Sequence, residues 1–218
     1  MPRHEVISGW LTRIRALGFE RVRTSAVSPR TQEVLEEHGF HVAQQLTMLS
    51  AELSADTCGR SSFVSDGRVP VPRHASRVMR RVLGFDNYAR VLQVDAAAFG
   101  TRWCLDHVEL RHAIRATERS RLFTTGHRDV DAFVVVGATD RTGFLQRLAV
   151  RPAVQSMGHG TALLRRALQW LHSQQCTTAY VNTEHTNTPA LSLYASHGFT
   201  VGKSGLAVLE LPLEVSIS

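Results

Sequence analysis

A glycine-bearing turn between a strand-like run and a helix-like run limits the possible folds of this chain more than any other feature. The strand-like run covers residues 144–150, and the turn covers 155–161. The helix-like run covers 161–172 and contains leucines at helical spacing. Gly158 and Gly160 lack Cβ atoms, so an anion could approach the backbone closely at these positions. The helix that follows would direct its free N–H groups and the positive end of its dipole toward that anion. The turn therefore predicts a cradle for a phosphate or pyrophosphate. A glycine needed only for strand-to-helix packing is the alternative.

Periodicity and turn signals place further elements on both sides of this turn. In chain order we expect a strand at 88–94, a helix at 95–117 broken near Gly100, strands at 122–125, 132–137 and 144–150, a helix at 161–172, a strand at 178–182, a helix at 189–196 and a strand at 206–211. The strands at 132–137 and 144–150 form a hairpin around the turn at 139–143. Antiparallel strands followed by a strand-helix-strand-helix-strand order predict a mixed α/β sheet.

Composition predicts a soluble, cytoplasmic protein with more than one segment. The chain has 218 residues, 43% of them apolar, and no apolar run long enough to span a membrane. Its first residues lack the layout of a secretion signal. Residues 54–76 are rich in Ser, Gly, Pro and Arg. We therefore divide the chain into an N-terminal segment at 1–53, a linker at 54–81 and a larger domain at 82–218.

The charged and metal-binding residue types exclude several classes of function. The net charge of +6 is concentrated in an arginine-rich stretch at 60–90, which has few interleaved aromatic residues and reads as a solvated linker rather than a nucleic-acid site. Cys58, Cys104 and Cys176 are widely spaced and show no C-x-x-C pattern, so we expect reduced, structural thiols. The histidines show no zinc-ligand spacing, and no metal site is expected.

Two motifs in the C-terminal half carry a family resemblance. Gln155-x-x-Gly158-x-Gly160 follows one strand, and Asn187-x-x-Ala190-x-x-Leu193-Tyr194-x-x-x-Gly198-Phe199 follows the next. Together, in this order, they resemble the GCN5-related N-acetyltransferase (GNAT) superfamily over roughly residues 82 to 213. The resemblance implies an α/β (α+β) fold, with a mixed, mostly antiparallel sheet flanked by helices and a splayed parallel pair of strands that holds the CoA arm.

The same resemblance implies acetyl-CoA as the cosubstrate and assigns residues to its binding. The strand end at 148–150 would pair with the pantetheine arm, the N–H groups of the turn would hold the pyrophosphate, and Asn187 would bond the arm, cap the following helix, or do both. The cofactor-binding residues that it implies are Leu148, Ala149, Val150, Gln155, Ser156, Met157, Gly158, His159, Gly160, Thr161, Asn187 and Tyr194.

The implied reaction is direct attack of a neutral amine on the acetyl carbonyl, with the backbone N–H of Val150 facing the oxyanion. Tyr194 occupies the family's general-acid position, although a core aromatic is the plain alternative. The position of the general base differs from that in related enzymes that act on protein N-termini. Those enzymes often have a glutamate five residues before the motif asparagine, where this chain has Asn182. Glu184 is the leading candidate, followed by His185 and Glu109; a water chain could also serve.

The N-terminal segment resembles a partial second copy of the same domain. A shift of 159 residues aligns Val22, Thr24, His38, Gly39, Phe40 and Val42 with Val181, Thr183, His197, Gly198, Phe199 and Val201. Ser28 then stands at the place of Asn187 and Leu35 at that of Tyr194, so this copy lacks the chemistry. A half-domain must bury its apolar face, and we expect it to do so against the larger domain or in a homodimer.

We therefore expect an N-acetyltransferase that moves an acetyl group from acetyl-CoA to a primary amine. The amine could belong to a small molecule, a peptide or a protein, and Phe99, Trp103 and residues 105–109 are its expected neighbours. The alternative is a noncatalytic acyl-CoA-binding regulatory module in which Tyr194 only packs. No membrane or nucleic-acid partner is expected.

Overall fold

The computed structural model describes residues 4–54, 77–126 and 129–213, and the side chains of 77–87 are not described. Its contacts divide the chain into two compact units. We call Ala51–Val181 the central unit, and Met1–Ser50 together with Asn182–Ser218 the terminal unit. Two strands, β2 (His41–Glu52) and β6 (Thr178–Glu184), run through the division.

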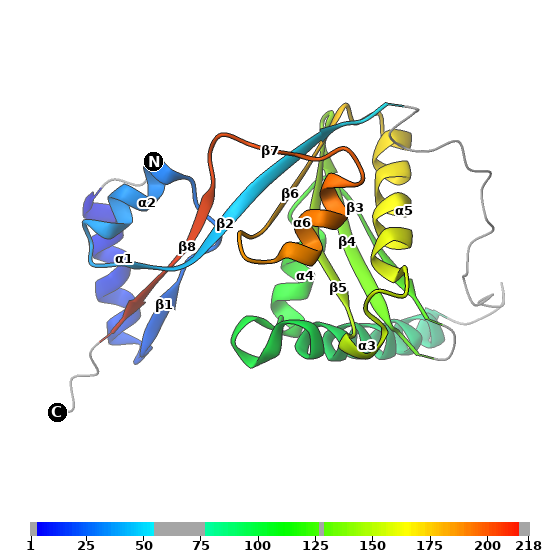
Figure 1. Cartoon of the computed structure of the whole chain (residues 1–218). Helices are drawn as coiled ribbons and strands as arrows, with labels where there is room; N and C mark the ends of the chain where they lie inside the picture. Colours follow the sequence, from blue (N-terminus) through cyan, green and yellow to red (C-terminus); the bar gives the residue numbers. More distant parts are fainter. Residues whose placement is uncertain (1–3, 55–76, 127–128, 214–218) are drawn as a thin grey trace. The chain divides into compact units, whose positions relative to one another are not determined.

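The central unit is a sheet with helices packed on it (Figure 1). Its remaining elements are α3 (Arg77–Trp103), α4 (His107–Arg115), β3 (Arg119–Thr125), β4 (Ala132–Thr139), β5 (Thr142–Val150), a 3₁₀ turn (Pro152–Val154) and α5 (His159–Ser173). Strands β3, β4 and β5 are antiparallel neighbours, and β6 adds to β5 in parallel from Thr142↔Thr178 to Leu145↔Val181. A parallel strand with a helical crossover after a hairpin is the arrangement that the order of elements predicted.

Strand β4 forms the centre of this core, because its side chains are buried from Ala132 to Ala138. Phe133 and Val135 pack with residues of α3 and α4, including Val91, Val94 and Leu110. Helix α5 also packs against β3, β4 and β5, and buries its own leucine stripe. Helices therefore cover the strand on both sides, which explains a continuous apolar run instead of alternation.

The terminal unit combines both ends of the described chain. Its elements are α1 (His4–Ala16), β1 (Arg21–Arg23), α2 (Pro29–Glu36), most of β2, α6 (Thr188–Ala195), β7 (Thr200–Val201) and β8 (Leu206–Pro212). Strand β8 lies between β1 and β2 and is antiparallel to both. Hydrogen bonds from Leu213 N to Glu20 O (2.8 Å) and from Thr24 N to Leu209 O (2.9 Å) extend this pairing. The C-terminal strand β8 therefore lies between two strands of the N-terminal segment, and β7 pairs with the far end of β2.

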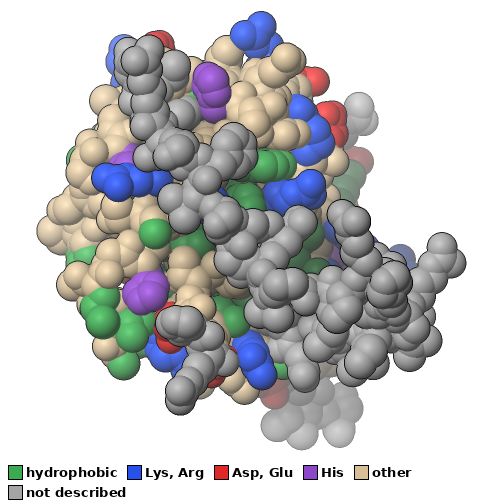
Figure 2. Space-filling model, turned by 90° about the vertical axis from the view of Figure 1, so that its right-hand side faces the viewer, with side chains coloured by type: hydrophobic (Ala, Val, Ile, Leu, Met, Phe, Trp, Pro, Cys, Tyr) green, Lys and Arg blue, Asp and Glu red, His purple; other side chains and the backbone are tan. Residues whose placement is uncertain are grey.

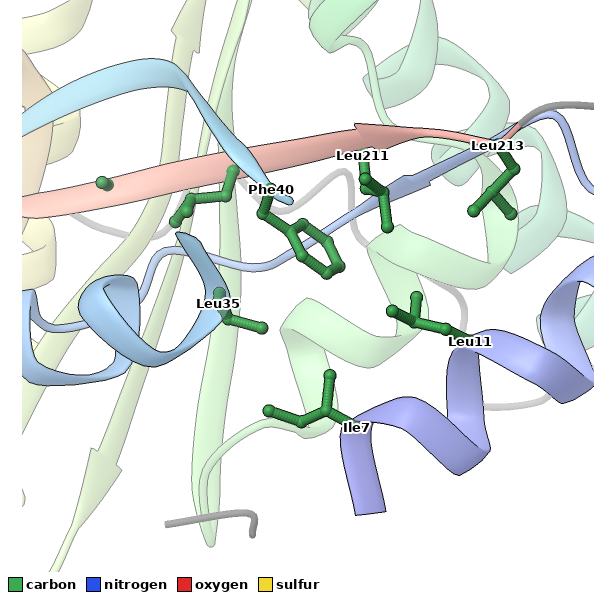
Figure 3. Packing of buried hydrophobic residues seen from close by; sticks show 8 residues of the cluster. Ile7, Leu11, Leu35, Phe40, Leu211 and Leu213 are labelled. Atoms are coloured by element: carbon green, nitrogen blue, oxygen red, sulfur yellow. The ribbon is translucent and has the colours of Figure 1, made fainter. Parts of the chain in front are cut away.

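One apolar core holds this unit together, and Figure 3 shows its side chains pointing toward one another from α1, α2 and β8. The N-terminal segment contributes Ile7, Leu11, Leu35 and Phe40, and the C-terminal strand contributes Ala207, Leu209, Leu211 and Leu213. The apolar face of the N-terminal segment is thus buried in cis, against the C-terminal strand of the same chain. The proposed ancestry of this segment as a partial repeat, and the division at 54–81, stay predictions.

The mixed, mostly antiparallel α/β fold is confirmed, and so is the break near Gly100, which has φ of 69° between two helical stretches. The predicted strand at 88–94 is wrong, because these residues lie inside α3. Tyr88, Val91 and Leu92 pack into the central core at helical spacing, and a short apolar run alone does not distinguish strand from helix. Most of the predicted linker, 55–76, lies outside the described residues, while 77–81 are helical.

The core of the terminal unit predicts a strong effect of Leu209→Ala. Leu209 is fully buried, so the change should lower the free energy of unfolding by about 2–5 kcal/mol, as other buried leucine truncations do. The matched control is Leu17→Ala, because Leu17 is 67% exposed and its loss should cost about 0.5 kcal/mol or less. Urea unfolding followed by the fluorescence of Trp10 measures both. Equal effects of the two changes would contradict burial of β8 in this core.

Candidate functional site

The turn after β5 has the geometry of an anion-binding loop. Gly158 has φ of 88° and Ser156 has φ of 62°, so two residues just before α5 have positive φ. The first hydrogen bond of the helix runs from Ala162 N to Gly158 O (2.9 Å). The N–H groups of the three residues between them therefore have no acceptor inside the helix, and they share the positive end of its dipole. A Cβ atom at Gly158 would meet nothing within 4 Å, which shows open space over the loop.

Side chains at both ends tie this loop to the sheet. The ring Nδ1 of His159 lies 2.9 Å from Oγ1 of Thr125, at the end of β3. Gln155 Nε2 donates to the carbonyl oxygen of Val150 at 3.3 Å, at the end of β5. These two contacts hold the start of α5 close to the ends of two strands. The loop is thus braced while its backbone N–H groups remain directed outward.

The last residues of β5 direct alternate backbone groups to opposite sides. Arg151 N donates to Asp131 O (2.8 Å), on the side of β4. Because successive residues of a strand alternate, Leu148 and Val150 direct their N–H and C=O groups away from β4. The bond from Gln155 to the Val150 carbonyl agrees with this direction. The parallel ladder with β6 has its last pair at Leu145↔Val181, so 148–150 lie beyond it. This segment offers the backbone edge that an extended ligand arm would pair with.

A β-bulge coincides with the end of that ladder. The register between β4 and β5 passes from Val136↔Leu145 to Val135↔Arg147, which leaves Gln146 as the extra residue. Bulges bend a strand and increase its twist, and they recur next to active sites. The bulge thus lies at the residue that follows the last β5 position of the parallel ladder.

A buried ion pair fixes the connection between α3 and α4 against β5. Asp95 is fully buried, and Arg147 donates to both of its carboxylate oxygens at 2.7 and 3.0 Å. The same guanidinium donates to Trp103 O (2.7 Å) and stacks 3.5 Å from the ring centre of Phe99. Asp95 also accepts from Leu105 N at 2.6 Å. Arg147, the residue before Leu148, thus anchors the connection between α3 and α4, which is the segment expected to lie near the acceptor amine. Sequence reasoning missed this pair, and an aspartate inside an apolar helical stretch was its only signal.

Among the other acidic candidates, Glu109 has a structural role. Its carboxylate accepts from Asp106 N at 2.8 Å, while Asp106 accepts from Val108 N and Glu109 N, which forms a capping box at the start of α4. These N–H bonds, with that from Glu109 first, lower the pKa of the Asp106 carboxyl below its usual value. Glu109 thus completes a helix cap, and its role as a base stays a prediction.

In the terminal unit, the predicted residues lie at the end of β6 and on α6. Glu184 is the last residue of β6 and accepts a hydrogen bond from Gln44 Nε2. Asn187 caps α6, with its Oδ1 accepting from Ala190 N at 3.2 Å. His185, the other predicted base, is exposed. The capping alternative for Asn187 is therefore seen directly, and it leaves the amide NH₂ group as a donor for a ligand.

Tyr194 is a buried residue of α6 with 5% exposure, and its ring centre lies 5.6 Å from that of Phe199. Burial raises the pKa of the Tyr194 phenol to about 12. The hydroxyl is therefore protonated at every physiological pH, as a proton donor must be. The same shift makes it a weaker acid than an exposed tyrosine, whose pKa is about 10.

The predicted residues fall into two groups, each ordered within its own unit. The strand end and loop, 148–161, belong to the central unit, and Glu184, Asn187 and Tyr194 belong to the terminal unit. Both groups follow the strands of the parallel pair in sequence, because β5 leads into the loop and β6 ends at Glu184. Their assembly into a single site stays a prediction.

Other groups in the described residues give no competing site. No cluster of three metal-ligating side chains occurs in the described ranges, and burial raises the pKa of the Cys176 thiol, which disfavours a nucleophilic thiolate. None of the helices in the same ranges combines the length and apolar character that a membrane span needs. On the face shown in Figure 2, the visible Lys and Arg side chains are spaced among other residue types.

Comparisons with known proteins point to one family. The family model described as "Acetyltransferase (GNAT) family" matches residues 95–199, which include both sequence motifs. A search of curated proteins found no match to the chain.

Several solved structures share the fold at low sequence identity. A GCN5-related N-acetyltransferase from Sphaerobacter thermophilus matches with 17% identity and a TM-score of 0.53, over 88% of this chain and 59% of that protein. One from Kribbella flavida matches with 13% identity and a TM-score of 0.57, over 97% of this chain and 76% of that protein. A tandem GNAT protein from the clavulanic acid biosynthesis pathway matches with 13% identity and a TM-score of 0.60, over 95% and 69%. This chain thus spans about three fifths of the Sphaerobacter protein's length.

The burial of Tyr194 predicts a pH-dependent stability. Its pKa is about 12 in the folded chain and about 10 when exposed on unfolding. Because the folded value is the higher one, the stabilisation is complete below about pH 10 and is lost as the pH rises toward about 12. Over this range, wild type should lose on the order of 2–3 kcal/mol of unfolding free energy relative to Tyr194→Phe. Urea unfolding of both proteins at several alkaline pH values tests this, and parallel pH curves would contradict it.

Proposed function

We propose, from the match of residues 95–199 to the acetyltransferase (GNAT) family, that the chain transfers an acetyl group from acetyl-CoA to a primary amine. The observation that carries the proposal is the continuous segment 148–161. It offers outward backbone groups at Leu148 and Val150, and the free N–H groups of a helix start a few residues later. An extended amide arm followed by a pyrophosphate fits these two features in that order. The expected acceptors are small-molecule, peptide or protein amines.

In the proposed binding mode, the residues of this segment have separate tasks. The outward backbone groups of Leu148 and Val150, with Ala149 between them, form the edge that pairs with the pantetheine amides as an added half strand. The backbone of the loop from Gln155 to Thr161 binds the pyrophosphate, and the start of α5 adds the favourable end of its dipole. The open space over Gly158 permits the close approach of phosphate oxygens. Asn187 donates from its amide to the arm while its oxygen caps α6.

The proposed reaction forms one C–N bond and breaks one C–S bond. Glu184 takes a proton from the acceptor ammonium, and the neutral amine then attacks the acetyl carbonyl. The Val150 N–H, which is directed away from β4, donates to the oxygen that becomes negative. Collapse of the tetrahedral intermediate expels the CoA thiolate, which receives a proton from Tyr194. The second proton of the attacking nitrogen passes through solvent to the Tyr194 phenolate, so the products are the amide, CoA and the proton taken by Glu184. No covalent intermediate with the protein is needed.

The comparison of Tyr194 with Leu35 supports a role for the phenol hydroxyl. The bounds of α2 and α6 lie 159 residues apart, so Leu35 and Tyr194 occupy corresponding positions in the predicted repeat, and both are buried. The helix ends also agree, because Phe40 N bonds to Leu35 O (3.2 Å) as Phe199 N bonds to Tyr194 O (3.1 Å). The corresponding position of α2 thus carries a leucine, and we assign the hydroxyl of Tyr194 to the chemistry of the proposed reaction.

One observation favours the second candidate, a noncatalytic acyl-CoA-binding regulatory module. The pKa of about 12 for Tyr194 exceeds that of a free thiol, about 8.5, by roughly 3.5 units. Complete proton transfer to a free thiolate would thus be uphill by about 5 kcal/mol. The acid role requires the proton to move while the C–S bond breaks, when the sulfur is most basic. Release of CoA with an amine panel separates this enzyme from a module that only binds.

The loop assignment predicts weaker acetyl-CoA binding in Gly158→Val. A valine is strained at φ of 88°, by about 1–2 kcal/mol or more, and the loop would have to leave its binding conformation. We expect at least about a tenfold increase in the dissociation constant, measured by calorimetry. Met157→Ala is the control, because Met157 is 69% exposed and the change keeps the backbone. Unchanged affinity of Gly158→Val would refute the loop assignment.

The acid role predicts a slow but folded Tyr194→Phe protein. The change removes one hydroxyl and keeps the ring that packs on Phe199. We expect kcat to fall about 100-fold or more, with little change in the KM for acetyl-CoA. Steady-state release of CoA measures both parameters. A variant with the kcat of wild type would instead leave Tyr194 as a packing residue.

A further inference from the structure

The side chain of Gln44 connects the N-terminal segment to the proposed general base. Its Nε2 donates to Oε1 of Glu184, although the two residues are 140 positions apart in sequence. Both belong to the terminal unit, Gln44 on β2 and Glu184 at the end of β6. A segment that lacks the motif asparagine and tyrosine thus contacts a residue with a proposed chemical role.

A β-bulge turns Gln44 toward this contact. Along β2, Val42 pairs with Leu209 and Gln44 pairs with the adjacent Val208, so Ala43 is the extra residue. Val42 and Leu209 face the apolar core of the terminal unit. Without the bulge, Gln44 would share the face of Val42, because residues two apart in a strand point the same way. The extra residue moves the amide to the opposite face, where a polar group can meet a carboxylate.

The chemistry of the pair suits a positioning role. A carboxylate has two oxygens, and an amide N–H that holds Oε1 restricts the rotation of the Glu184 side chain. The amide carries no charge, so it adds no competing base and does not neutralise the carboxylate as an arginine or lysine would. A base must lie within hydrogen-bonding reach of the proton that it takes, so a restricted carboxylate transfers protons more often.

We propose that Gln44 is a positioning residue for Glu184, and that the N-terminal segment contributes to acetyl transfer through this hydrogen bond. The inference rests on the proposed function, in which Glu184 is the base. It gives the incomplete repeat a task beyond the pairing of its strands with β8. It also gives a function to the β-bulge at Ala43, which lies two residues after His41, where the pairing of β2 with β8 begins.

The test uses the full chain and four variants. Gln44→Met keeps the length of the side chain and removes the donor, and Gln45→Met makes the same change at the exposed neighbouring position. Glu184→Gln and the double variant Gln44→Met/Glu184→Gln complete the cycle. CoA release is measured with acetyl-CoA and a panel of kanamycin, ethylenediamine and a peptide that has a free α-amine and one lysine.

With the best acceptor of the panel, Gln44→Met should lower kcat about tenfold, the order expected for one hydrogen bond to a charged group. The KM for acetyl-CoA and the melting temperature should stay near those of wild type, and Gln45→Met should behave as wild type. In the Glu184→Gln background, Gln44→Met should cause no further loss, because its effect passes through the carboxylate. A purely structural role would lower kcat equally in both backgrounds.

Three outcomes overturn the inference, and they differ from one another. If Gln44→Met keeps the wild-type kcat, or loses as much in both backgrounds, the positioning role fails while the proposed function stands. If Glu184→Gln keeps full activity, the base assignment fails and the positioning role fails with it. If wild type releases no CoA with any amine of the panel, the proposed function fails first.

Discussion

The insertion of β8 between β1 and β2 is the interaction that makes a folded unit out of the two ends of the chain. Strand β1 has three residues, so the N-terminal segment offers little sheet of its own. Strand β8 bonds to it and its flanking residues from Glu20 to Val27, and also supplies Leu209 and Leu211 to the core. Buried Glu210 adds an ion pair with Arg23 at 2.7 Å. Without β8, Ala207, Leu209 and Leu211 would be missing from the core that α1 and α2 share.

This strand also determines where the polar residues of the terminal unit point. The bulge at Ala43 is a shift in the register between β2 and β8. It places the side chain of Gln44 where it bonds to Glu184. In the central unit, the Asp95–Arg147 pair has a comparable role, because it anchors the residues between α3 and α4 beside β5. Breaking a buried pair leaves an uncompensated charge, so such contacts hold geometry more than they add stability. In each unit, one polar contact thus orients the chain next to a proposed catalytic or binding residue.

Local signals in the sequence predicted most of the expected helices and strands. They did not predict which residues far apart in sequence would pair. The helix expected at 189–196 is observed as Thr188–Ala195, because Asn187 and Pro189 mark its start within a few residues. Residues 88–94 were predicted as a strand, since an apolar run of that length fits both periods until the covering helices are known. The position of β8, the Ala43 bulge and the Asp95–Arg147 pair depend on residues 50 or more positions apart. For the candidate site, the loop was found because its glycines and helix are adjacent in sequence, whereas Gln44 carries no motif.

Native-state hydrogen exchange of the full chain tests the pairing of β8 most directly. The amides of Leu213, Thr24 and Val27 donate to backbone carbonyls, and that of Leu209 donates to Thr24 Oγ1, all within one unit. As denaturant is added, they should therefore merge into one opening reaction with the same free energy. The amides of β4, in the central unit, report a separate core. If the β8 amides instead exchange together with β4, while Thr24 and Val27 exchange freely, the C-terminal strand does not complete the N-terminal segment.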